Sequence, residues 1–146
     1  RPEVKHRHRA RRLALQTLCC LDAQGEDAMD LAVTFIREGR ESLDVMAIAE
    51  RMAREAWAAR DQADRLVAAH SPRWDVPRMP VVDRGILRLA CWELAAGDAP
   101  PKVVLNEAIR LAQEFSTVES PRFINGVLAA VARDLAPQTP PTPQHP

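Results

Sequence analysis

The 146-residue chain has no tyrosine, few glycines and cysteines, and no long apolar run. No segment approaches the roughly 20 apolar residues that span a membrane, and no signal-peptide pattern is recognisable. Cys19 and Cys20 are adjacent while Cys91 is distant, so the three cysteines match neither a disulfide framework nor a metal-binding spacing. A chain of this kind suits a reducing compartment, and we expect a cytoplasmic protein.

The usual sequence patterns of catalysis are also missing. There is no glycine-rich phosphate loop. Glu107 and Glu114 share a helix face, but they lie too far apart along it to act as a carboxylate pair. His6 and His8 flank an arginine, and no carboxylate or cysteine completes a metal site with them. We therefore interpret the histidines as part of a solvated basic arm, and expect no enzymatic activity, no metal and no cofactor.

Apolar residues recur at helical spacing throughout, whereas alternating patterns never persist. This predicts an all-α domain of about six or seven helices over residues 1–135. The expected apolar face of the first helix is Ala10, Ala14, Thr17, Leu18 and Leu21, and that of the second is Ala28, Leu31, Ala32, Phe35 and Ile36. Further helices are expected within 45–67 (one or two helices), 82–94, 104–115 and 124–135. Proline-rich stretches predict a loop at 70–80, a helix end at Gly97 and a disordered tail at 136–146.

Charge is distributed unevenly along this chain of zero net charge. Residues 1–12 hold six Lys or Arg and one acid, for a net charge of +5, and the remainder holds 14 Lys or Arg and 19 acids, for a net charge of −5. A basic arm on a slightly acidic body indicates an anionic partner at one place on the molecule.

A helical wheel positions the cations of this arm. If the first helix begins near Lys5, then Lys5, Arg9 and Arg12 lie opposite its apolar face, while Arg7 and Arg11 lie on the flank. We expect all four arginines to point to solvent or to a ligand, and guanidinium groups suit phosphates and stack on bases. A disordered basic terminus that aids solubility is the alternative, but the clustering of charge favours contact with nucleic acid.

The stretch "ESPRFINGVL" at 119–128 combines helix-start signals with an aromatic and a cation. Ser120 is placed to cap the last helix. Phe123 lies at the edge of the expected buried face and Arg122 on the exposed side, so the ring could stack on an unpaired base. On the residues alone, packing of Phe123 under a neighbouring loop is slightly favoured over stacking. Gly126 could let another helix backbone approach closely.

Three segments together resemble one known family. "KVVLNEAIRLAQEFSTVESPRFINGVL" (102–128), "VDRGILRLACWEL" (82–94) and "RRLALQTLCCLDAQG" (11–25) are similar to the NusB family of transcription antitermination factors. The resemblance implies seven helices in two small bundles, with no catalysis and no cofactor. It also implies binding of single-stranded boxA RNA in ribosomal RNA leaders, together with NusE, a small ribosomal subunit protein, within a transcription elongation complex.

The resemblance also implies which residues bind. The arginine-rich first helix and the start of the last helix match the family's RNA surface, and it reverses the preference on Phe123 in favour of base stacking. Together with the basic-arm analysis, the expected RNA-binding residues are Lys5, Arg7, Arg9, Arg11, Arg12, Gln16, Glu119, Arg122 and Phe123. Asp83 matches an acidic residue on the NusE-facing surface, so the acidic body is expected to meet a basic ribosomal protein.

Two departures and two alternatives stay open. Cys19 stands where family members often carry tyrosine, and the proline-rich tail has no counterpart in the resemblance. NusB-like domains also begin ribosomal RNA cytosine methyltransferases, so the chain could be a fragment of such an enzyme. It could also be an interaction module that forms a homodimer through the face expected to meet NusE.

Overall fold

The computed structural model describes residues 2–71 and 75–136, and these form seven α-helices, two short 3-10 helices and no strand. This confirms the all-α prediction, while the predicted tail beyond Ala136 lies outside the described residues. The helices are α1 (Pro2–Gln24), α2 (Met29–Glu38), α3 (Leu43–Ala58), α4 (Arg60–Ala69), α5 (Val81–Ala96), α6 (Pro101–Phe115) and α7 (Ser120–Leu135). The 3-10 helices are η1 (Glu26–Ala28) and η2 (Val76–Arg78).

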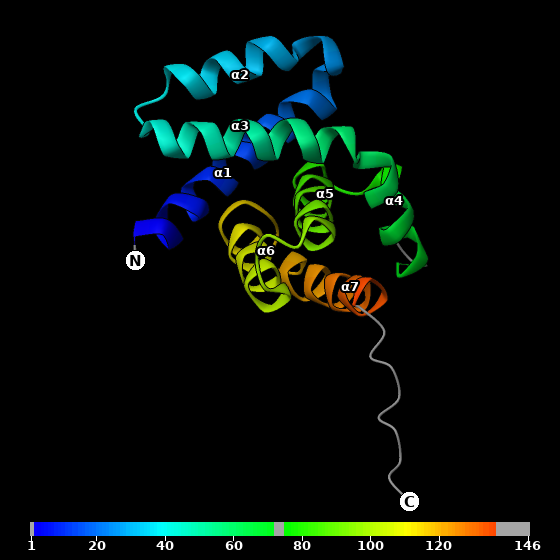
Figure 1. Cartoon of the computed structure of the whole chain (residues 1–146). Helices are drawn as coiled ribbons and strands as arrows, with labels where there is room; N and C mark the ends of the chain where they lie inside the picture. The colour runs from blue at the N-terminus through cyan, green and yellow to red at the C-terminus, as the bar shows by residue number, and fades with distance from the viewer. Residues whose placement is uncertain (1, 72–74, 137–146) are drawn as a thin grey trace, which may run out of the picture.

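The helices form two groups that meet at α5 (Figure 1). In Figure 1, α1, α2 and α3 lie together above, and α4 to α7 lie below. Helix α5 contacts α1, α3, α4, α6 and α7. It buries apolar side chains such as Ile86, Leu89 and Trp92, as expected for a helix that packs against five others. Gly85 permits close contact with α1, because a Cβ there would lie 2.9 Å from Leu15 Cδ1.

The predicted apolar face is correct for the first helix and only partly correct for the second. All five residues predicted to line the first helix are buried, and the region 45–67 forms two helices that meet at Ala59. The predicted face of the second helix is correct for Ala32 and Ile36, which are buried, and wrong for Leu31 and Phe35, which are 56% and 65% exposed. Helix α2 packs on α1 and α3 through Ala32, Val33 and Ile36. The buried face is therefore rotated toward Val33, and the rest of this short outer helix faces solvent. Phe35 lines an open hollow between α1 and α2, together with Gln16 and Thr17.

Helix ends agree with the sequence signals in some places only. Gly97 adopts a left-handed conformation with φ 73° and ends α5 as predicted. Ser120 is the first residue of α7 and makes no cap hydrogen bond there, so its predicted capping role is wrong. Gly126 faces open space, since a Cβ would meet nothing within 4 Å, and the predicted close approach of another helix at this position is therefore wrong.

Candidate nucleic-acid interface

One face of α1 presents a row of polar and cationic side chains. Lys5, Arg9, Arg12 and Gln16 follow one another at steps of four, three and four residues, so they lie along the same side of the helix. Lys5, Arg9 and Gln16 are exposed and Arg12 is half-buried. The structure therefore confirms the predicted orientation of Lys5, Arg9 and Arg12 away from the core. We call these four residues the α1 stripe.

Arg11 behaves differently from its neighbours. Its side chain is only 3% exposed and forms a bidentate ion pair with Glu93 of α5. Nε donates to Oε2 at 2.9 Å, and Nη2 donates to Oε1 at 2.9 Å. Arg7 reaches the same carboxylate from one turn earlier, at 3.7 Å. The expectation that Arg11 points to solvent or to a ligand is wrong, because the desolvated Glu93 requires a cation beside it. The Arg11–Glu93 ion pair thus stabilises the packing of α1 against α5.

Carboxylates of the body also meet His8, Arg9 and Arg12 of α1. His8 Nδ1 lies 2.6 Å from Glu107 Oε2 on α6, so His8 is not part of a solvated arm. Arg9 Nε lies 3.2 Å from Glu41 Oε2, and Arg12 Nη2 lies 2.7 Å from Glu114 Oε1. Residues 5–12 are thus not a free polycation but are partly neutralised by acids of the body they pack on.

Arg12 also lies over an aromatic ring that the sequence patterns did not single out. Its Cζ is 5.5 Å from the centroid of Phe115, at the end of α6, which is within the range of a cation–π contact. Phe115 is half-buried. Phe115 is the last residue of the helix predicted within 104–115, and only the contact with α1 reveals that it adjoins the α1 stripe.

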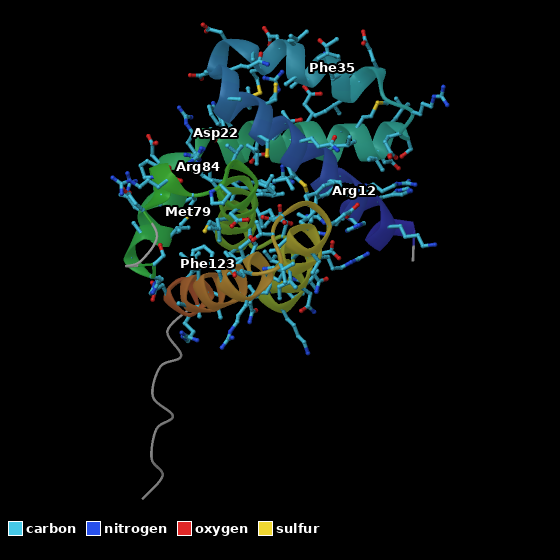
Figure 2. The ribbon with its side chains drawn as sticks, turned by 180° about the vertical axis from the view of Figure 1, so that it is seen from behind. Arg12, Asp22, Phe35, Met79, Arg84 and Phe123 are labelled. Atoms are coloured by element: carbon cyan, nitrogen blue, oxygen red, sulfur yellow. The ribbon has the colours of Figure 1, made fainter. Side chains whose placement is uncertain are left out.

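The start of α7 carries the second group of predicted RNA-binding residues. Glu119 and Arg122 are exposed, while Phe123 is half-buried and packs against the core. Phe123 thus lies at the edge of the buried face, as predicted. Figure 2 shows Arg12 and Phe123 at separate places on the molecule, so the structure brings Arg12 to Phe115 rather than to Phe123.

Asp83 is not a surface residue. It is 2% exposed, and it accepts hydrogen bonds from the hydroxyls of Ser116 and Ser120, the latter at 2.9 Å. These bonds tie the start of α5 to the connection between α6 and α7. The prediction that the Asp83 carboxylate lies on an exposed partner surface is wrong, because the hydroxyls fold over it. Val81, two residues before Asp83, and Val118, between Ser116 and Ser120, are exposed apolar residues, at 40% and 99%.

Comparisons with known proteins identify the family. A model of the NusB family matches residues 8–133. The chain is 41% identical to the transcription antitermination protein NusB of Symbiobacterium thermophilum, over 88% of this chain and 90% of the relative. It is 42% identical to the protein of the same name from Streptomyces coelicolor, over 90% of this chain and 94% of the relative.

The chain belongs to the NusB family.

Solved NusB structures share the fold described above. NusB from T. maritima superposes with a TM-score of 0.81 at 30% identity, over 90% of this chain and 93% of that one. A structure described as antitermination factors NusB and NusE in complex with dsRNA has a TM-score of 0.79 at 24% identity, over 89% and 98% of the two chains. These likenesses confirm the predicted NusB fold of seven helices in two small bundles.

Two of the three cysteines are shielded from water and have raised pKa values. Burial, and then the negative charge of Asp22, raise the pKa of Cys19 to about 11. Burial raises the pKa of Cys91 to about 12. Because the thiolate is the reactive form, these raised pKa values disfavour nucleophilic reactions of both thiols near neutral pH. Cys19 packs against the core beside the start of α5, where Sγ lies 3.9 Å from the carbonyl of Val81.

No metal-binding cluster and no membrane-spanning helix is found among residues 2–71 and 75–136. Within these ranges no group of three or more His, Cys, Asp or Glu is placed to hold a metal ion. No helix in the described part of this NusB-family chain is long and apolar enough to cross a membrane.

Proposed function

We propose that this NusB-family protein is a transcription antitermination factor that binds single-stranded, boxA-like RNA along the α1 stripe. The observation that carries the proposal is the stripe itself, where Lys5, Arg9, Arg12 and Gln16 present cations and an amide on one exposed helix face. Phosphates recruit such cations, and unpaired bases can hydrogen-bond to an amide. The name shared by the curated relatives supports the choice of antitermination over other RNA-binding roles.

The proposed RNA surface extends from α1 toward α7. Phe115 lies next to Arg12 and offers part of its ring as a stacking platform. Glu119, Arg122 and Phe123 at the start of α7 are proposed to contact the same strand farther along. Arg11 is left out of the surface because it is buried, and Arg7 contributes mainly through Glu93.

We further propose that a NusE-like small ribosomal subunit protein binds near the start of α5. The solved NusB–NusE–RNA complex of the same fold supports a partner of this kind. Because Asp83 is buried, the contact would use the exposed apolar surroundings of Val81 and Val118. We propose that the assembly acts on the transcription elongation complex in the cytoplasm.

Two alternatives are less well supported. A ribosomal RNA methyltransferase fragment would share the helical domain, but the curated relatives quoted above are antitermination proteins matched over 90% or more of their length. A homodimer through the Val81 and Val118 surface would compete with a NusE-like partner. Sedimentation of the protein alone and with that partner distinguishes the two.

Titration of a labelled, boxA-like single-stranded RNA tests the proposal. Wild-type protein should bind it, and addition of a NusE-like protein should increase the affinity. Replacing Lys5, Arg9 and Arg12 together by Gln should weaken binding at least tenfold. Replacing Arg37, Arg51 and Arg54, three exposed arginines of α2 and α3, removes the same charge elsewhere and should have a small effect. Equal losses from the two triple variants would overturn the proposed surface.

A further inference from the structure

The two arginines of the α1 stripe are each paired with one carboxylate from another part of the chain. Arg12 of α1 meets Glu114 in the last turn of α6 at 2.7 Å, and Arg9 meets Glu41 in the connection between α2 and α3 at 3.2 Å. Both pairs are open to water: the side chains are 42% and 37% exposed in the first pair and 43% and 29% exposed in the second. The cations that face outward therefore already hold an anion.

In such an exposed pair, an RNA phosphate can replace the carboxylate as the partner of the arginine. An ion pair in water contributes little to folding stability, so breaking it does not unfold α1. A guanidinium binds a phosphate as readily as a carboxylate, because its N–H groups donate to either anion in the same forked geometry. The pair of Arg11 with Glu93 is different, because both side chains are nearly inaccessible, at 3% and 4%, and a phosphate cannot reach between them.

The displaced carboxylate remains close to the incoming phosphate. Glu114 is anchored in a helix and cannot move away by more than the length of its own side chain. Two like charges a few ångströms apart at a protein surface repel measurably. RNA binding at Arg12 therefore loses one ion pair and gains one repulsive contact, and the same holds at Arg9 and Glu41.

We propose that Glu114 and Glu41 compete with RNA phosphates for Arg12 and Arg9, and that they thereby set the affinity of the α1 stripe for RNA. This inference rests on the proposed RNA-binding function of α1. It assigns to two acidic residues a role in RNA binding that charge clustering alone does not indicate. A strand must deliver phosphates to both arginines together to displace both carboxylates.

The test compares wild-type protein with Glu114→Gln and Glu41→Gln by titration of labelled boxA-like RNA at one fixed, low salt concentration. Each variant should bind about three- to tenfold more tightly, given the size of charge interactions at a protein surface. The matched control is Glu55→Gln, which removes the same charge from another exposed pair, that of Arg51 and Glu55 on α3 at 2.6 Å. It should leave RNA affinity nearly unchanged.

A double variant tests whether Glu114 acts through Arg12. If it does, Glu114→Gln should give little gain when Arg12 is already replaced by Gln. Thermal melting of the same samples should show nearly unchanged stability. Wild-type binding with no gain in Glu114→Gln, an equal gain in Glu55→Gln, or a full gain without Arg12 would overturn this inference and leave the proposed function intact. No RNA binding by the wild-type protein would overturn both.

Discussion

At the scale of single residues, Arg11 and Arg12 are adjacent in sequence but have opposite roles. Arg11→Gln should destabilise the fold, because Glu93 would remain buried without its bidentate partner, and breaking a buried pair costs about 3–5 kcal/mol. Arg12→Gln breaks an exposed pair worth about 0–1 kcal/mol. Urea unfolding should rank Arg11→Gln as far less stable, and RNA titration of folded protein should show the larger loss for Arg12→Gln. The opposite ranking would contradict both assignments.

Asp83 is expected to matter for folding rather than for partner charge. Asp83→Ala removes the acceptor for the hydroxyls of Ser116 and Ser120, and unsatisfied buried groups cost about 1–3 kcal/mol. Asp83→Asn keeps an acceptor oxygen and should cost less. Chemical denaturation gives the stabilities. An Asp83 variant of unchanged stability that loses affinity for a NusE-like protein would show that Asp83 contacts this partner directly.

Phe123 combines packing with an accessible edge. Phe123→Ala should cost about 1–2 kcal/mol of stability, less than the 3–5 kcal/mol of a fully buried phenylalanine, since the ring is only half-buried. If the exposed edge stacks on a base, RNA affinity should fall by a further ~1–3 kcal/mol. Leu43→Ala at the start of α3 is the control, because that apolar side chain is 81% exposed and is not among the proposed RNA-binding residues. If Phe123→Ala loses stability but keeps its RNA affinity, Phe123 has a packing role only.

At the scale of elements, the α1 stripe predicts how RNA binding depends on salt. Its three cations are Lys5, Arg9 and Arg12. With about −0.7 per phosphate contact on single strands, log K should fall against log salt with a slope of roughly −2. A titration from low to high salt measures this slope. A slope near zero would exclude α1 as the phosphate-binding element, and a slope of roughly −3 would indicate a fourth phosphate contact, such as the one proposed for Arg122.

What the sequence could predict depends on whether the determinant is local. The outward face of α1 follows from helical periodicity, a property of neighbouring residues. The burial of Arg11 depends on Glu93, which is 82 positions away, and that of Asp83 depends on Ser116 and Ser120. The role of Phe115 likewise depends on a distant arginine. Periodicity cannot reveal such partners, so the fold was predicted well and the site only in part.

At the scale of the whole molecule, one charge network joins several elements. Asp22 of α1 accepts hydrogen bonds from Arg84 and Arg88 of α5 (Figure 2 shows Asp22 and Arg84), and Arg88 also binds Asp64 of α4 at 2.8 Å. Arg84 donates to the carbonyls of Val76 and Met79 as well. Burial alone would raise the pKa of Asp22, but its hydrogen bonds and the charges of the two arginines lower it overall.

This lowered pKa predicts acid sensitivity with a definite sign. The unfolded chain takes up a proton on Asp22 at higher pH than the folded protein does. Its contribution to stability is therefore complete above about pH 4 and lost as pH falls through the lower pKa of the folded state. Asp22→Asn should be less stable at neutral pH, and its unfolding free energy should fall less between pH 5 and 2. Parallel pH profiles for the variant and the wild type would contradict this.

The ion pairs of α1 also bear on events during synthesis of the chain. His8 and Glu107 are 99 positions apart, and Arg11 and Glu93 are 82 apart. The cations of α1 are therefore translated long before most of the carboxylates that hold them. Until α6 has left the ribosome, the nascent chain exposes these charges beside ribosomal RNA. Chains truncated before α5 should bind RNA of any sequence. The binding surface becomes selective only when the complete polypeptide supplies the carboxylates that pair with these cations.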